Sequence, residues 1–235
     1  HRLDALDITH DEDHDMLPDV LDPCPTNPDT AANVDTDQDG VGDLCDPAPN
    51  IGGDRKFLYT FESGLGDLVP YHTPTIETDS ISFGNPANTM LDGVWTPISF
   101  TRVHIEVGYE IGAVGIGTGT TNYEELSVHL GNSGDHAGLD GLACSLERFD
   151  QSAMVHFYIE NVPGAELMGM DEIYALTGTH GKLVVDNAGQ LLCTSQRDGV
   201  GAVSVINNTG TIPGEVGVTA FQLRARITYL FVAGL

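Results

Sequence analysis

A spacing of aspartates that occurs twice near the start of the chain is the feature that most constrains its fold. The stretches DEDHDMLPDVLD (11–22) and DTDQDGVGDLCD (35–46) both read D-x-D-x-D-x-x-x-D-x-x-D. The aspartates at positions 1, 3, 5, 9 and 12 are Asp11, Asp13, Asp15, Asp19 and Asp22 in the first copy and Asp35, Asp37, Asp39, Asp43 and Asp46 in the second. Two carboxylates about 4 Å apart repel by roughly 4 kcal/mol at an effective dielectric near 20. Converging carboxylates at a fixed spacing therefore predict a bound cation.

Calcium chemistry accounts for the spacing. Calcium takes six to eight oxygen ligands at about 2.3–2.6 Å, and a loop that curls around it presents positions 1, 3 and 5 inward, with position 12 closing the shell. Position 7 supplies its main-chain carbonyl, which predicts that role for Leu17 and Val41. Position 6 turns sharply, where glycine is easiest; Gly40 occupies it in the second copy, whereas Met16 departs from the pattern in the first. We expect at least two calcium ions.

Two other interpretations of the acidic segment are weaker. A disordered acidic linker needs neither a fixed spacing nor cysteines. Zinc prefers clusters of cysteine and histidine with ligand spacing, and no such cluster occurs in the segment.

The flanks of the two copies resemble the thrombospondin type 3 repeat family. After the first copy come a Cys-Pro pair (DPCP, 22–25) and an Asn-Pro element (NPD, 27–29), and the second copy ends in LCD. The resemblance covers residues 11–46. Two features depart from the family pattern: Met16, and the spacer from Cys24 to Asp35, which looks one residue too long. It implies structure that depends on calcium, an extracellular location and a disulfide between Cys24 and Cys45.

Composition divides the chain into two parts. The formal net charge is −26, and residues 1–50 contain 14 Asp and Glu residues, one Arg and no aromatic residue. Such a segment cannot build an apolar core, so metal binding would supply its folding free energy. We expect calcium-binding repeats over 1–46, a linker over 47–54 and a β-sandwich over 55–235. Because the chain begins at His1, we also expect it to be a processed or trimmed piece of a longer protein.

The charge also limits the partners. Nucleic acids and anionic membrane surfaces need basic patches, and only nine Lys and Arg residues are present. No run of about 18 apolar residues occurs, so no membrane span is expected.

The second part of the chain has the pattern of an all-β domain. In RVHIEVGYEIG, the alternation puts Val103, Ile105, Val107, Tyr109 and Ile111 on one face and His104, Glu106 and Glu110 on the other. The sequence predicts a hairpin turn at 187–189 and a short helical turn within 164–176. The predicted strands are 57–61, 98–107, 111–117, 125–130, 142–148, 153–160, 182–186, 190–195, 201–206, 214–220 and 223–233.

Many short strands with glycine-rich turns favour an antiparallel sandwich. The opening FLYTFESGLGD (57–67) and the closing PGEVGVTAFQLRARITYLFVAG (213–234) resemble those of concanavalin A-like jelly rolls of the laminin G and legume lectin type. The resemblance implies a glycan or an extracellular protein as ligand. The expected fold class is therefore mainly β, an antiparallel jelly-roll sandwich preceded by a short irregular segment that calcium stabilises.

Four cysteines, an even number, fit disulfides in an oxidising compartment. Cys144 and Cys193 both fall in the middle of predicted strands. We expect them to bridge neighbouring strands; the alternative is two buried free thiols.

Catalytic motifs are absent from the sequence. Jelly-roll glycosidases of the laminarinase type carry E-x-D-x-x-E on one strand, which pairs carboxylates on one face, and this chain has no such motif. Glu106, Glu110, Glu124 and Glu125 are expected on solvated strand faces or loops, and Trp95 in a core rather than as a platform for a sugar. We predict no catalytic residue and no organic cofactor.

These patterns together predict a secreted or surface-displayed module for calcium-dependent adhesion or ligand display. A spacer made rigid by calcium would carry the sandwich, which would bind a glycan or a protein. Two alternatives remain: a structural subunit of a surface fibre that associates with itself, and an enzyme that acts on glycans through an unrecognised site.

Overall fold

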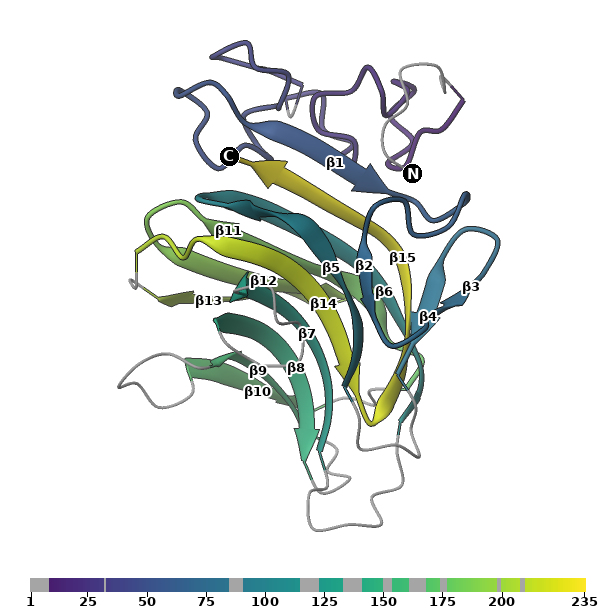
Figure 1. The fold of residues 1–235 in the computed structure, drawn as a ribbon. Helices are drawn as coiled ribbons and strands as arrows, with labels where there is room; N and C mark the ends of the chain where they lie inside the picture. Colours follow the sequence, from purple (N-terminus) through teal and green to yellow (C-terminus); the bar gives the residue numbers. More distant parts are fainter. Residues whose placement is uncertain are drawn as a thin grey trace.

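The computed structural model describes residues 9–31, 33–84, 91–114, 123–132, 141–149, 154–160, 168–173, 177–197, 200–207 and 210–235. These residues form two antiparallel sheets (Figure 1). The described part of the chain contains no helix with the length and apolar character needed to cross a membrane.

Sheet A has eight strands, in the order β13-β12-β11-β6-β15-β4-β3, with β1 also paired to β15. Its strands are β1 (Arg55–Tyr59), β3 (Thr75–Ile76), β4 (Ile81–Phe83), β6 (Val103–Val114), β11 (His180–Asn187), β12 (Leu191–Arg197), β13 (Val200–Asn207) and β15 (Leu223–Gly234). Because β15 pairs with β1 near its end and with β4 near its start, β1 and β4 follow one another along the same edge of β15.

Sheet B has seven strands, in the order β10-β9-β8-β7-β14-β5-β2. Its strands are β2 (Val69–Tyr71), β5 (Leu91–Phe100), β7 (Tyr123–Asn132), β8 (Leu142–Phe149), β9 (Met154–Glu160), β10 (Met168–Ile173) and β14 (Gly214–Phe221). The short connection from β14 to β15 takes the chain from one sheet to the other.

The core lies between the sheets, where the predicted alternation of β6 is confirmed. Its five apolar residues, Val103, Ile105, Val107, Tyr109 and Ile111, are all buried in one cluster with Leu126, Val128 and Leu130 of β7. Cys144 of β8 and Cys193 of β12 form a disulfide within this core. The expectation that these cysteines lie on neighbouring strands is wrong, because β8 belongs to sheet B and β12 to sheet A.

The predicted hairpin is confirmed between β11 and β12, where Gly189 has a φ of 107°. The helical turn expected within 164–176 is wrong over Met168–Ile173, which form β10; the rest of that range lies outside the described residues. The predicted break between 107 and 111 is also wrong. The chain breaks instead at 101–102, between β5 and β6.

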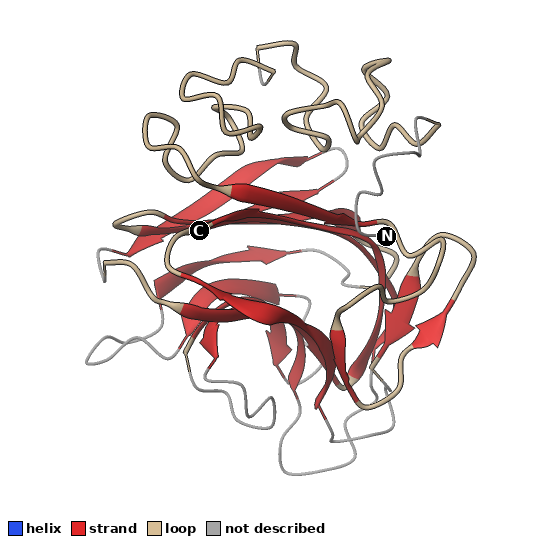
Figure 2. Ribbon diagram, turned by 45° about the horizontal axis from the view of Figure 1, so that its top comes forward, coloured by secondary structure: helices blue, strands red, loops and turns tan. Residues whose placement is uncertain are grey.

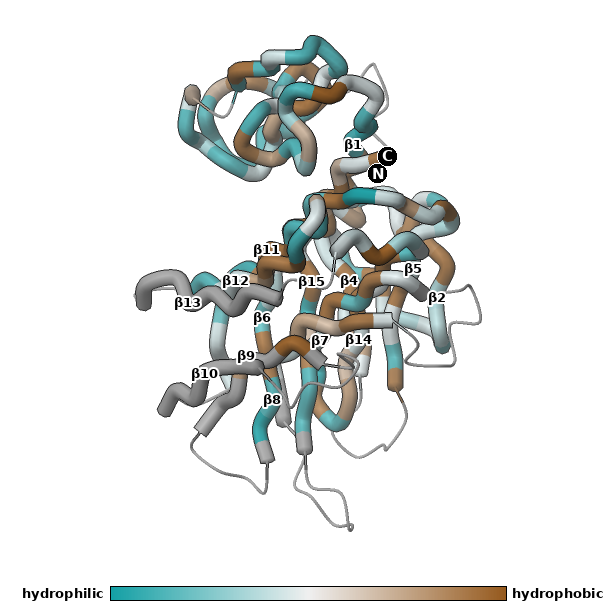
Figure 3. The backbone as a smooth tube through the Cα atoms, turned by 90° about the vertical axis from the view of Figure 1, so that its left-hand side faces the viewer, coloured by the Kyte–Doolittle hydropathy of each residue, from teal (hydrophilic) through white to brown (hydrophobic). Residues whose placement is uncertain are grey.

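Residues 9–54, hereafter the N-terminal segment, contain no strand in their described part and lie over the outer face of sheet A (Figures 2 and 3). The Cys24–Cys45 disulfide and Val41 pack in one buried cluster with Leu58 of β1 and Phe231 of β15. The segment therefore uses the sheet as its apolar core, since its own sequence supplies almost none.

Candidate functional site

The two acidic repeats fold into loops with matching backbones, hereafter loop 1 (11–22) and loop 2 (35–46). Positions 4 and 6 of both loops have positive φ: His14 at 63° and Met16 at 79°, Gln38 at 66° and Gly40 at 97°. Carboxylates at positions 1, 3 and 5 accept from main-chain N–H groups at positions 6, 5 and 7. The pairs are Asp11–Met16 (3.0 Å), Asp13–Asp15 (3.1 Å) and Asp15–Leu17 (2.7 Å), then Asp35–Gly40 (2.9 Å), Asp37–Asp39 (3.3 Å) and Asp39–Val41 (3.0 Å). Sequence repetition therefore corresponds to structural repetition.

The aspartate at position 9 closes each loop by accepting hydrogen bonds from the residue at position 2 of the same loop. Asp43 accepts from the N–H of Thr36 at 2.8 Å and from its hydroxyl at 2.6 Å. Asp19 accepts from the N–H of Glu12 at 2.8 Å and pairs with the His10 ring through its other oxygen. Both oxygens of these two carboxylates are thus engaged within the protein.

The remaining repeat aspartates, except Asp22, belong to compact groups. The ligand oxygens of Asp11, Asp13 and Asp15 lie within 4.8 Å of one another, as do those of Asp35, Asp37 and Asp39. Among the described residues, Asp19, Asp22 and Asp43 lie outside the three groups of this kind. The carbonyl roles of Leu17 and Val41 stay predictions; the Val41 side chain is buried against sheet A.

Five of these carboxylates keep one buried oxygen that has no hydrogen-bond partner in the described parts of the chain: Asp11, Asp13, Asp22, Asp37 and Asp46. A buried acceptor without a donor costs about 1–3 kcal/mol. Hard oxygens in this arrangement fit a calcium ion, which needs acceptors and no donors.

Burial and mutual repulsion raise the pKa values of several of these acids. The pKa of Asp22 rises to about 6 and that of Asp46 to about 7; burial is the larger cause and neighbouring aspartates add to it. The pKa of Glu12 rises to about 7 for the same reasons. A cation reverses this effect, since it favours the ionised carboxylates.

A third group includes Asp54, which sequence reasoning missed. Its carboxylate lies within 4.8 Å of ligand oxygens of Asp39 and Asp46. Asp54 immediately precedes β1, outside both repeats, so the aspartate spacing gave no signal for it.

A buried polar network lies on the outer face of sheet A. His104 pairs with Asp186 at 2.5 Å and with Glu106 at 3.2 Å, and the Lys182 ammonium donates to Glu106 at 2.7 Å. The expectation of a solvated face is wrong for Glu106, which is buried and has its charge satisfied by two partners, His104 and Lys182.

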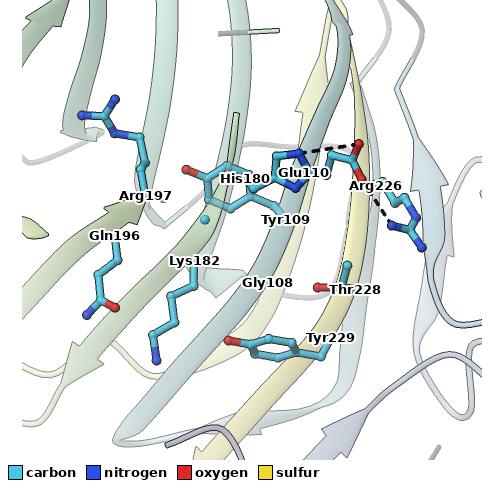
Figure 4. Close-up of a pocket in the computed structure, with 11 residues that line it drawn as sticks. Gly108, Tyr109, Glu110, His180, Lys182, Gln196, Arg197, Arg226, Thr228 and Tyr229 are labelled. Atoms are coloured by element: carbon cyan, nitrogen blue, oxygen red, sulfur yellow. Dashed lines mark hydrogen bonds and ion pairs between the residues drawn. The ribbon is translucent and has the colours of Figure 1, made fainter. Parts of the chain in front are cut away.

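A hollow of about 730 Å³ lies beside this network on the same sheet (Figure 4). Strands β6, β11, β12 and β15 line it with Glu110, Lys182, Gln196, Arg226 and Tyr229, among others. Glu110 lies between His180 (3.9 Å) and the Arg226 guanidinium (3.2 Å), so its charge is held in place. The hollow offers fixed donors, fixed acceptors and an aromatic ring within one volume.

Two carboxylates face each other on sheet B. In the register of β7 and β8, Glu125 lies opposite Glu147, and the next inward pair, Ser127 and Ser145, shares a hydrogen bond of 2.7 Å. Glu125 and Glu147 are only 3% and 4% exposed. The expectation of solvation is therefore wrong for Glu125, and also for Glu124, which is buried against Arg148.

Trp95 lies on the same face of sheet B as this pair. It is fully buried, its ring packs 5.4 Å from that of His129, and it covers Gly217 so closely that a Cβ there would lie 2.2 Å from the indole. The expected burial of Trp95 is confirmed.

No family model matches the sequence, and no curated protein matches it. Solved structures do match the fold. Peanut lectin with a nine-residue peptide has a TM-score of 0.59 and 8% identity, over 77% of this chain and 97% of that chain. Winged bean acidic lectin with methyl-alpha-D-galactose has 0.57 and 10%, over 77% and 99%. Crh5 transglycosylase with NAG has 0.53 and 10%, over 81% and 90%. At these identities the fold alone is established: an antiparallel jelly roll of the legume lectin type, as expected from the sequence.

Proposed function

We propose that this protein is an extracellular carbohydrate-binding module whose N-terminal segment is folded by calcium. The observation that carries the calcium part is the set of five buried carboxylate oxygens without hydrogen-bond donors in the described chain. Disulfides at Cys24–Cys45 and Cys144–Cys193 support an oxidising location.

Calcium would be held by the group at positions 1, 3 and 5 of each loop, completed by the carbonyls of Leu17 and Val41 and, in loop 1, by Asp22 at position 12. The ion supplies positive charge that offsets carboxylate repulsion. The protein itself supplies the loop shape, through the N–H groups that hold each aspartate and through Asp19 and Asp43, which close the loops internally.

The sandwich would bind a glycan in the hollow of Figure 4. Sugar hydroxyls both donate and accept hydrogen bonds, and the hollow provides both functions: Glu110 accepts, Arg226 and Lys182 donate, and the Gln196 amide does both. Its volume of about 730 Å³ lies within the usual range for ligand sites. Ion pairs already hold Glu110, Arg226 and Lys182, so little side-chain entropy remains to be lost on binding.

Glycan-array screening, followed by titration calorimetry with the best ligand, tests this proposal. Gln196→Ala should weaken binding at least tenfold, because it removes an amide from the hollow while Gln196 has no ion-pair role in the described structure. Gln190→Ala is the matched control, since Gln190 is exposed in the β11–β12 turn, away from the hollow. Failure of the array to find any glycan, with calcium present, contradicts the carbohydrate function.

A second candidate function is glycan cleavage, favoured by the opposition of Glu125 and Glu147. Residues directly opposite in an antiparallel pair have Cβ atoms about 4.5–5.5 Å apart. Retaining glycosidases use two carboxyl groups about 5–5.5 Å apart, one as the acid and the other as the nucleophile, and Cβ atoms at this spacing allow two glutamate side chains to reach that separation. The laminarinase-type motif places such carboxylates on one strand, whereas here they come from two.

Hydrolysis assays on polysaccharides and aryl glycosides separate the two functions. Activity that is lost in Glu147→Gln, with the fold kept by circular dichroism, would establish an enzyme. Binding without turnover, unchanged in that variant, leaves the binding function alone.

A further inference from the structure

Three carboxylates, two from loop 2 and one from the residue before β1, meet where the N-terminal segment joins the sandwich. Asp39 and Asp46 belong to loop 2, and Asp54 immediately precedes β1. Asp39 also belongs to the group at positions 1, 3 and 5 of its loop, so it borders two groups at once. The Asp46 carboxylate, which the aspartate spacing assigns to the loop 2 shell, lies here instead with Asp54.

The backbone is shaped to bring Asp54 to this place. Gly53 has a φ of 114°, a conformation that L side chains rarely adopt. With this turn, the N–H groups of Gly53 and Asp54 both donate to the same Asp39 oxygen, at 2.9 and 2.7 Å. The linker thus wraps around the loop 2 carboxylate rather than leading away from it.

Burial makes the group costly without a cation. Asp46 and Asp54 are 8% and 2% exposed. One Asp46 oxygen accepts from the N–H of Ala48 at 2.6 Å, while the other is buried with no partner in the described residues. That second oxygen belongs to the carboxylate that meets Asp39 and Asp54, so it is available to a ligand there.

The charge of the group matches a divalent ion. Three carboxylates carry three negative charges, and the Arg102 guanidinium, bound to both Asp54 oxygens at 2.9–3.1 Å, neutralises one of them. Two negative charges remain. Each carboxylate oxygen has two lone pairs, so Asp54 can accept from Arg102 and still face a cation. A hollow of about 350 Å³, lined by Asp39, Val41, Asp54 and Lys56, gives access from solvent.

We propose that Asp39, Asp46 and Asp54 form a separate divalent-cation site, the junction site, which fastens the N-terminal segment to the sandwich. The inference rests on the proposed calcium function but adds an ion that neither acidic loop accounts for. Through Arg102, between β5 and β6, the ion would couple calcium binding to the end of sheet A, where Leu235 pairs with the Arg102 main chain. Calcium would then regulate the sandwich as well as the segment.

Titration calorimetry with calcium chloride on the full chain tests the junction site. Asp54→Asn should remove one ion per chain, or weaken it at least tenfold, and leave the ions of loops 1 and 2 in place. Asp29→Asn is the matched control, because Asp29 is an exposed aspartate of the same segment outside all three groups. If Asp54→Asn and wild type bind calcium with equal stoichiometry and affinity, the junction site is overturned while calcium binding by the loops stands. If wild type binds no calcium, the calcium function itself is overturned.

Asp54 also pairs with Arg102, so a second variant separates the ion from the ion pair. Arg102→Gln keeps all three carboxylates and should retain the junction ion, with calcium raising the melting temperature at least as much as in wild type. Asp54→Asn should reduce that calcium-induced rise. If both variants reduce it equally, Asp54 serves only Arg102 and the proposal fails.

Discussion

Cys144 of β8 and Cys193 of β12 tie sheet B to sheet A across the core of the sandwich, in the middle of both strands. Their strands are not hydrogen-bonded to each other; β8 pairs with β7 and β9, and β12 with β11 and β13. The bond therefore opposes separation of the layers, a motion that no ladder hydrogen bond in either sheet resists.

Removing this disulfide should destabilise the sandwich. Its cysteines are 49 residues apart, and closing a loop of that length is worth about 4 kcal/mol in the chain-entropy model. The double variant Cys144→Ala/Cys193→Ala should lose up to about that much unfolding free energy in urea titrations. The Cys24→Ala/Cys45→Ala variant is the comparison: it should lower calcium affinity and affect the sandwich less. The opposite order would contradict the assigned roles.

Stability should depend on pH through His104. Burial lowers its pKa, but hydrogen bonds and charge from Asp186 and Glu106 outweigh burial and raise it from 6.5 to about 9. A raised pKa in the folded state contributes stability below pH 6.5 that is lost as pH rises through 9. Wild type should therefore exceed His104→Gln in unfolding free energy most strongly near pH 6, and the difference should shrink towards pH 9.5.

The acidic side of the same profile reports Glu106. Burial raises the pKa of Glu106, but the hydrogen bonds and charges of His104 and Lys182 outweigh burial and lower the pKa from 4.5 to about 2. This contribution is present above pH 4.5 and is lost as pH falls through 2. Both contributions are complete only between pH 4.5 and 6.5. A wild-type advantage over His104→Gln that is flat from pH 5 to 9.5 would show that the network carries no charge of this kind.

Exchanging the residue types at position 6 of the two loops should change calcium affinity in opposite directions. Met16 has a φ of 79°, its side chain is almost fully exposed, and its place in loop 1 matches that of Gly40 in loop 2. An L residue in this left-handed region costs roughly 1–2 kcal/mol. Glycine avoids this cost, but part of the gain is lost because glycine makes the unfolded chain more flexible. Met16→Gly should tighten calcium binding up to about fivefold, and Gly40→Met should weaken it. Calcium titrations that move both variants in one direction contradict the shared loop geometry.

Neighbouring residues of loop 2 should differ sharply in their effect on calcium. The Asp37 carboxylate has a buried oxygen without a donor in the described residues, whereas Gln38 is exposed. Asp37→Ala should reduce calcium affinity at least tenfold, and Gln38→Ala should change it less than twofold, by titration calorimetry. Equal effects would return the segment to the interpretation of an acidic linker.

The alternation of apolar residues predicted the long strands because each must bury one face, as in β6. It could not predict β2, β3 and β4, which are two or three residues long and have no period to detect. The loops were predictable because their aspartates are close in sequence. Asp54, Arg102 and the Glu125–Glu147 pair were not, since tertiary register alone brings them together. Glu106 was misjudged because its partner Lys182, and Asp186, which pairs with His104, come from a distant part of the chain.

The antiparallel pairing of β1 with β15 has a mechanical consequence. Arg55 lies opposite Gly234 and Tyr59 opposite Leu230, so the start of β1 and the end of β15 share one corner of the molecule. Tension applied between residues 54 and 235 would therefore peel β1 away one residue pair at a time instead of shearing all pairs together. Val41 and the Cys24–Cys45 bridge pack across both strands, at Leu58 and Phe231. They would act as a latch over the line of peeling, and calcium would set the force at which it opens.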